Sequence, residues 1–240
     1  MSARQRIVLL VFVLAAVSVH AVTREDVEAG AARLYRERVE EARQRYQLDA
    51  DTAFLERVQR IAARLIAQAA YESDVVEGLA WEIHTTTDPE ENASCMAGGK
   101  LLIGQAYAQR LQLDDAELAM LIAHEMEHAL QQHNLKEARE ALRLEPQWDM
   151  RPYAELEYAI DHDEGLMRKL DAFDVEQEFE ADREGMRLAV HAGWPAKELA
   201  NYFKKLVHHD LMANADRREH PAPARRWRAA QALAAELNPS

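Results

Sequence analysis

The pentapeptide HEMEH at residues 124–128 constrains this chain more than any other feature. It lies inside AELAMLIAHEMEHALQQH, whose apolar residues recur at helical spacing. Residues four apart project from the same face of an α-helix, so His124 and His128 can point their ring nitrogens at one metal ion. Glu125 lies about 100° around the helix from His124. It could therefore flank such an ion as a base without binding it.

This pattern is the HExxH signature of zinc proteases. Two histidines on an exposed helix would look the same in a chain with 10 histidines. A catalytic zinc also needs a third protein ligand and one open position. Downstream, the run EQEFEADREGMRLA places Glu178 and Asp182 four residues apart on a predicted helix. Glu178 is the candidate third ligand and Asp182 the candidate acceptor for a ligating histidine's N–H, although an ordinary acidic helix face remains the alternative.

Helical patterns dominate the chain, so the expected fold class is α+β, predominantly helical, with a small sheet. Alternation in LAWEIHTT (79–86) predicts one strand, and KLLIG (100–104) predicts a second. We expect residues 146–174, with two prolines, to be irregular. Asp114 or Asp115 is expected to cap a helix that runs to residue 130, and Gly193-Trp194-Pro195 to end a helix at 175–191. The other helices are expected at 24–47, at 51–71, at 196–213 and after the loop 220–227.

The first 21 residues differ from the rest of the chain. Arg4 and Arg6 precede an apolar run at 7–19, and small residues at a cleavage position end at Ala21. This pattern predicts a signal peptide at 1–21, which leaves one domain at 22–240 with an N-terminal helix at 24–47 and a core at 48–230. A membrane anchor is the alternative, but the run falls short of the ~20 residues that span a bilayer. We therefore expect no integral membrane protein after cleavage.

The net charge argues against binding to nucleic acid, and the single cysteine excludes an internal disulfide. The net charge is −13, and cleavage after residue 21 would make it −15 by removing two arginines. Such a surface repels nucleic acid, so no nucleic-acid partner is expected. The single cysteine, Cys95, cannot form an internal disulfide, and no base is visible beside it. Stability must then come from the core or from a metal ion.

Together the motifs resemble the prenyl-protease/HtpX/BepA-type zinc metallopeptidases, a gluzincin family. The resemblance spans about residues 46–230. It rests on NASCMAGGKLLIG, on AELAMLIAHEMEHALQQH with His133 five residues after the second histidine, on EADREGMRLAVHAGWP and on HPAPARRW, in family order. Two departures are Ala97 in place of a usual proline and Asp174-Val175 in place of a frequent Ser-Arg. Neither departure changes an expected metal ligand.

The resemblance implies a zincin-type metallopeptidase domain with an active-site helix and one Zn²⁺ per chain. His124, His128 and Glu178 would bind the zinc, Glu125 would be the base and Asp182 the supporting acid. His220 and Arg226 would stabilise the oxyanion of the reaction, unless they are ordinary loop and helix residues. His220 could instead fill the open metal position and keep the enzyme latent.

The expected function is an exported, periplasmic zinc endopeptidase that hydrolyses misfolded or flexible polypeptides in envelope quality control. Its partners would be polypeptide substrates and other envelope proteins. We expect KLLIG to be an edge strand to which an extended substrate adds. A zinc-stabilised, proteolytically silent chaperone-like protein is the alternative, and a metal-free helical interaction module is a third interpretation.

Overall fold

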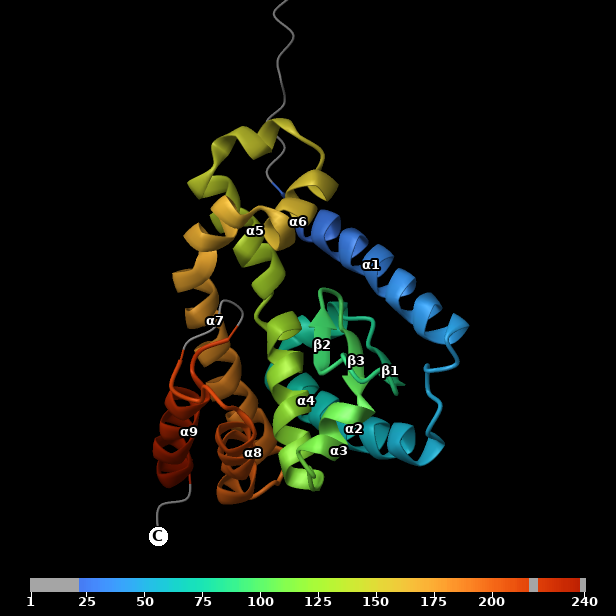
Figure 1. Ribbon diagram of the computed structural model, residues 1–240, viewed down its shortest axis with the longest axis vertical. Helices are drawn as coiled ribbons and strands as arrows, with labels where there is room; N and C mark the ends of the chain where they lie inside the picture. Colours follow the sequence, from blue (N-terminus) through green and yellow to red (C-terminus); the bar gives the residue numbers. More distant parts are fainter. Residues whose placement is uncertain (1–21, 216–219, 238–240) are drawn as a thin grey trace, which may run out of the picture.

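The computed structural model describes residues 22–215 and 220–237 (Figure 1). The predicted signal peptide at 1–21 lies outside the described residues. The strands are β1 Glu82–Thr86, β2 Ala93–Met96 and β3 Lys100–Gly104. The α-helices are α1 Arg24–Gln44, α2 Thr52–Glu72, α3 Gln105–Arg110, α4 Asp115–Leu130, α5 His133–Leu144, α6 Tyr153–His162, α7 Glu164–His191, α8 Ala196–His209 and α9 Pro223–Leu237, with short 3₁₀ helices at Asp74–Gly78 and Pro146–Met150. The predicted class, predominantly helical α+β, is confirmed.

Helix α4 is the centre of the main core. Its predicted start is confirmed, because the Asp114 side chain accepts a hydrogen bond from the Glu117 backbone N–H and Glu117 bonds back to Asp114. The helix is buried on nearly every face. It packs against α2 and β2 on one side and against α7 and α8 on the other. The HEMEH residues are therefore held inside the domain, where few alternative side-chain positions exist.

The sheet corrects one expectation and adds a strand. Its order is β1-β3-β2, with β1 parallel and β2 antiparallel to β3. The KLLIG segment is therefore the central strand, and its expected edge position is wrong. Leu101, Leu102 and Ile103 are all buried, as in a strand covered on both faces. The edge beside α4 belongs to β2, which the sequence analysis did not predict.

The stretch 146–174 is mostly helical, so the expectation of irregular structure is wrong. It contains α6 and the first turns of α7, which begins well before residue 175. Asp163 caps α7 by accepting hydrogen bonds from the backbone N–H groups of Gly165 and Leu166. The first half of α7 packs with α1, α5 and α6 around a second apolar cluster, which includes Val27, Leu135, Leu156, Leu166 and Leu170.

Other helix limits differ from the predictions by a few residues. The first helix ends at Gln44 and α8 ends at His209, while the predicted stop after α7 is confirmed by Gly193 with φ of 96°. Tyr35 ties α1 to the sheet by donating a hydrogen bond to the Leu101 carbonyl at 2.8 Å. Within the described residues, no helix has the length and apolar character needed to cross a membrane.

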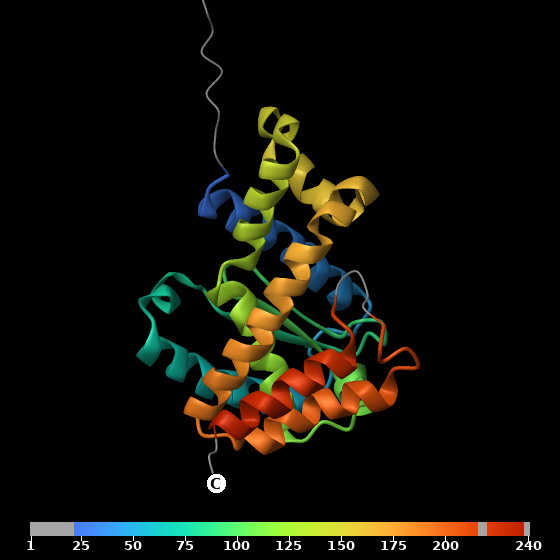
Figure 2. The ribbon, with the colours of Figure 1, turned by 90° about the vertical axis from the view of Figure 1, so that its left-hand side faces the viewer.

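Helices α4 and α7 cross closely at Gly185 (Figure 2). A Cβ atom at this position would lie 2.9 Å from the His124 backbone nitrogen and 3.0 Å from the Ala123 carbonyl carbon. Both neighbours are backbone atoms of a buried helix and cannot rotate away. A glycine is therefore required for α7 to approach α4 at the metal motif.

Gly185→Ala should force the two helices apart. The expected loss is about 1–3 kcal/mol in the free energy of unfolding, measured by urea denaturation, because overpacking strains a dense core. Gly78→Ala is the control, because Gly78 is exposed and the atoms nearest to an added Cβ, at 3.0 Å or more, belong to the flexible end of the Arg24 side chain. If Gly185→Ala is as stable as this control, the close crossing does not depend on the glycine.

Candidate metal centre

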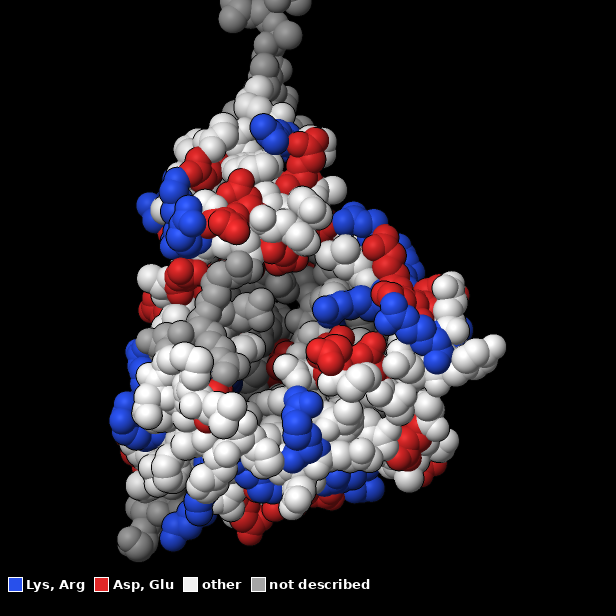
Figure 3. Space-filling model, in the orientation of Figure 1, with Lys and Arg blue, Asp and Glu red and all other residues white. Residues whose placement is uncertain are grey.

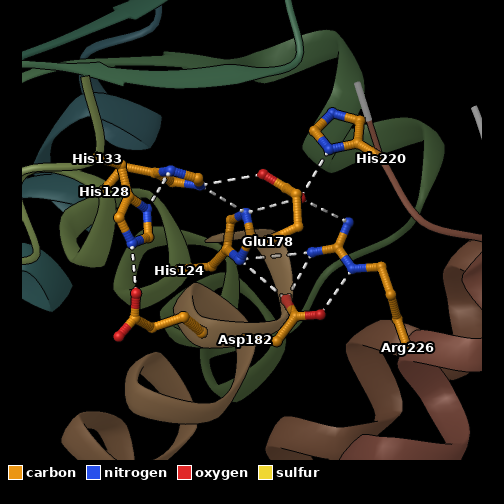
Figure 4. A network of polar contacts seen from close by, with 8 residues as sticks. His124, His128, His133, Glu178, Asp182, His220 and Arg226 are labelled. Carbon is orange, nitrogen blue, oxygen red and sulfur yellow. Dashed lines mark hydrogen bonds and ion pairs between the residues drawn. The ribbon is translucent and has the colours of Figure 1, made fainter. Parts of the chain in front are cut away.

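Two helices bring the predicted ligands together. His124 and His128 project from α4, and Glu178 reaches them from α7 (Figure 4). The His128 Nε2 atom lies 3.2 Å from Glu178 Oε1, and the His124 Nε2 atom lies 3.6 Å from Glu178 Oε2. One donor atom from each residue lies within 4.8 Å of the others. Two imidazoles and one carboxylate suit a zinc ion with one position left open.

Asp182 supports the first histidine. Its Oδ1 atom lies 2.9 Å from Nδ1 of His124, which leaves the His124 Nε2 atom facing Glu178. Arg226, on α9, donates two hydrogen bonds to the Asp182 carboxylate at 2.6 and 2.8 Å. Arg226 is only 5% exposed, so its charge is buried and satisfied within the site. Arg226 thus holds Asp182 in place, and it also lines a large cavity beside His220.

His133 supports the second histidine, a contact that the sequence analysis missed. Its Nδ1 atom lies 2.9 Å from Nδ1 of His128, and its Nε2 atom lies 3.1 Å from the Glu180 carboxylate. Burial and the nearby His128 lower the pKa of His133 to about 4, so the ring is neutral at pH 7. A neutral His133 can accept the Nδ1–H of His128 and leave Nε2 of His128 for a metal ion.

A left-handed turn at Gln132 brings His133 into contact with His128. Gln132 has a φ of 56° between α4 and α5, and this turn starts α5 so that His133 faces back toward His128. The five-residue spacing from His128 to His133 was the signal in the sequence. It could not be interpreted without knowing that α4 ends between the two residues.

Electrostatics favour an ionised Glu178. Burial raises the pKa of this carboxyl, but its positively charged and hydrogen-bonding neighbours outweigh burial and hold the pKa well below its usual range. These neighbours are His124, His128, His220 and Arg226. The pKa of Asp182 is also lowered, because attraction to Arg226 and contacts with His124 exceed the effect of burial. Both acids are therefore negatively charged at pH 7, as a cation site requires.

Glu125 and His220 line a cavity of about 670 Å³ in front of the metal residues. Its walls also include residues 91–94 leading into β2, together with Tyr107, Tyr202 and Arg226. The Nδ1–H of His220 donates a hydrogen bond to the Glu178 carboxylate at 2.8 Å, while the His220 side chain remains 53% exposed. Figure 3 shows this face of the molecule hollowed between α1 and the helices opposite. The cavity reaches the metal residues at His124, next to Glu125.

The grouped ligands do not include His84, Cys95, His208 or His209. His84 on β1 bonds to Asp49 at 2.6 Å, as a structural role predicts. Cys95 is buried in the core, and burial raises the pKa of its thiol well above the usual value. His208 and His209 are exposed at the end of α8.

The geometry predicts one tightly bound zinc ion per chain. Alanine at His124, His128 or Glu178 should abolish tight binding, measured by elemental analysis and by competition with a chelator. Asp182→Asn should weaken binding about 10–100-fold, because it removes the carboxylate that orients His124. His208→Ala is the control and should bind zinc like the wild type. Retention of full affinity by Glu178→Ala would contradict this ligand set.

Comparisons with known proteins agree with this centre. Residues 55–234 match the model of peptidase family M48. A stretch of 58 residues, 24% of the chain, is 34% identical to the mitochondrial metalloendopeptidase OMA1 of Arabidopsis thaliana, of which it covers 12%. A stretch of 83 residues, 32% of the chain, is 32% identical to the mitochondrial metalloendopeptidase OMA1 of Saccharomyces cerevisiae, of which it covers 24%. The similarity thus spans less than a quarter of either relative.

The family match runs from α2 to α9 and includes the HEMEH helix, Glu178, Asp182 and Arg226. It confirms the zinc metallopeptidase family inferred from the motifs. The zincin-type domain and the zinc cofactor follow from the same match together with the grouped ligands. The chain belongs to peptidase family M48, a family of zinc-dependent metallopeptidases.

Proposed function

We propose that this protein is a zinc endopeptidase that cleaves misfolded or flexible polypeptides. The observation that carries the proposal is the grouping of His124, His128 and Glu178, with His124 and Glu125 both in the wall of the large cavity. Membership of family M48 supports the reaction class. The OMA1 relatives are themselves named metalloendopeptidases, which favours cleavage within a chain over removal of its terminal residues.

In this proposal each polar residue has one task. His124, His128 and Glu178 hold the zinc ion, which when bound polarises a carbonyl group and makes water more acidic. Glu125 accepts a proton from the attacking water and returns it to the leaving amine. His220, on the exposed side of Glu178, donates a hydrogen bond to the oxyanion that forms on the substrate. Arg226 acts through Asp182 and adds a positive charge near Glu178, with its Nη1 atom 3.6 Å from Glu178 Oε2.

The substrate would bind as an added strand along β2. This edge strand pairs with β3 on one side, and residues 92–94 face the cavity that contains Glu125. Backbone hydrogen bonds to such an edge require an extended segment and recognise little of its side chains. Flexible or misfolded polypeptides meet that requirement, whereas a folded domain does not.

Glu125→Gln tests the reaction directly. It should lower the rate of casein or unfolded-peptide cleavage by about 10²–10⁴-fold, because it removes the proton acceptor. Zinc content should stay at one per chain, since Glu125 is not a ligand in this proposal. Glu198→Gln, an exposed acid on α8, is the matched control. A zinc-loaded wild type that cleaves no polypeptide would favour the alternative, a silent chaperone-like protein that binds unfolded chains.

We also propose that the protein is exported to the periplasm and acts there on envelope proteins. The support is the basic start and the apolar run of residues 7–19. In a bacterial host with an inner and an outer membrane, the mature protein should appear in the periplasmic fraction with Val22 as its first residue, measured by N-terminal sequencing. A product that keeps residues 1–21 and remains in the cytoplasm would contradict export.

A further inference from the structure

The large cavity has two unlike walls. On the side of the sheet it is lined by residues 90–94, which lead into β2 and are mostly polar. On the side of the helices α3, α4 and α8 it is lined by large apolar and aromatic side chains, namely Tyr107, Leu111, Leu121, Tyr202 and Leu206. We call this second set the apolar wall. Its volume of about 670 Å³ gives the cavity the size of a protein ligand site.

The apolar wall is part of the main core, so it is formed before any substrate binds. Leu111, Leu121 and Tyr202 belong to the buried core cluster, and Tyr107 and Leu206 pack against that cluster. Only the last two side chains are partly exposed. Because the core already fixes these side chains, a ligand would order few of them on binding, which lowers the entropic cost.

The apolar wall carries no charge of its own. The hydroxyl groups of Tyr107 and Tyr202 form a hydrogen bond with each other at 3.2 Å, and burial raises the pKa of both, so both stay neutral. The neighbouring cation, Arg110, bonds to Asn92 Oδ1 at 3.2 Å and lies 5.4 Å from the centre of the Tyr107 ring. The wall therefore offers a bound side chain apolar contact and little polar competition.

The wall begins close to the reacting groups. Leu121 precedes Glu125 by one turn of α4, which is roughly 6 Å along the helix axis. An extended chain advances about 3.3 Å per residue, so this distance equals about two substrate residues. At the other end, Leu211 lines the cavity and is fully exposed to solvent. Apolar surface is thus present both beside the reacting groups and at a position open to solvent.

We propose that the apolar wall is a substrate subsite that accepts a large apolar side chain, such as leucine, one or two residues from the scissile bond. Leu206 is its specificity-determining residue, because it is the aliphatic member of the wall that remains partly exposed. A polar side chain placed there would lose water without gaining a hydrogen-bond partner.

This inference rests on the proposed endopeptidase function and narrows its substrates. Strand addition along β2 uses the substrate backbone, and the apolar wall adds a choice of side chain. Large apolar residues are mostly buried in folded proteins, so a misfolded polypeptide is the form in which they become accessible.

Binding without turnover tests the subsite separately from catalysis. The zinc-loaded full chain carrying Glu125→Gln would be titrated with labelled eight-residue peptides by fluorescence anisotropy. The peptides are identical except that one position is leucine or the similarly sized, uncharged and polar asparagine, and that position is moved along the peptide. At one position leucine should lower Kd about tenfold, the effect of burying one such side chain. Equal affinity for leucine and asparagine at every position would overturn the proposal.

Adding Leu206→Asn to this protein should reduce the leucine preference to about threefold or less, because a polar group then faces the bound side chain. Val207→Asn is the matched control, since Val207 is the next residue of α8, is also partly buried and does not line the cavity. A preference that survives Leu206→Asn would remove Leu206 from the proposal. The preference is a ratio of two affinities for one protein, so the comparison in Glu125→Gln alone decides the matter if Leu206→Asn fails to fold.

Cleavage of the same peptides by the wild type separates the two proposals. If both are right, kcat/KM should be about tenfold higher for the leucine peptide, and the cleaved bond, identified from the product masses, should move with the leucine. Cleavage that does not depend on the leucine would overturn the subsite and leave the endopeptidase intact. A leucine preference in binding with no cleavage of either peptide would support the subsite and overturn the endopeptidase.

Discussion

The whole site depends on the close crossing of α4 and α7. Gly185 lets α7 lie against the backbone of His124, and Asp182 and Glu178 precede it by one and two turns on the same face of α7. The packing contact at Gly185 therefore also fixes the position of the two carboxylates along α7. It places them level with the imidazole rings of His124 and His128. A shift of α7 by one residue would rotate both acids away from α4.

Buried polar contacts then hold each ligand in one orientation. On one side Arg226 holds Asp182, which holds His124, and on the other Glu180 holds His133, which holds His128. Each series ends in a charge-assisted hydrogen bond, so the buried groups have the partners that offset their loss of water. Helix α9 thereby takes part in the metal centre although it supplies no ligand.

Much of this arrangement could be predicted from the sequence, because local signals and ligand spacing are read directly from neighbouring residues. The Asp114 cap, the stop at Gly193 and the pair of His124 and His128 are of this kind. Glu178, in contrast, was assigned as a ligand through the family resemblance. Strand β2 could not be predicted, since its four residues show no clear alternation and are defined by pairing with β3. The early start of α7 could not be predicted for the same reason, because its first half is buried by packing against α5 and α6.

The contact between His128 and His133 also depended on tertiary structure, through the left-handed Gln132 turn. That turn separates two parts of the molecule with different roles. Helices α4, the second half of α7 and α9 carry the chemistry, while residues 134–163 form a lobe with an apolar cluster of its own. Because the lobe has an apolar cluster of its own, a change in its packing can reach the metal centre through α5 and α7, the two helices that connect the lobe to it.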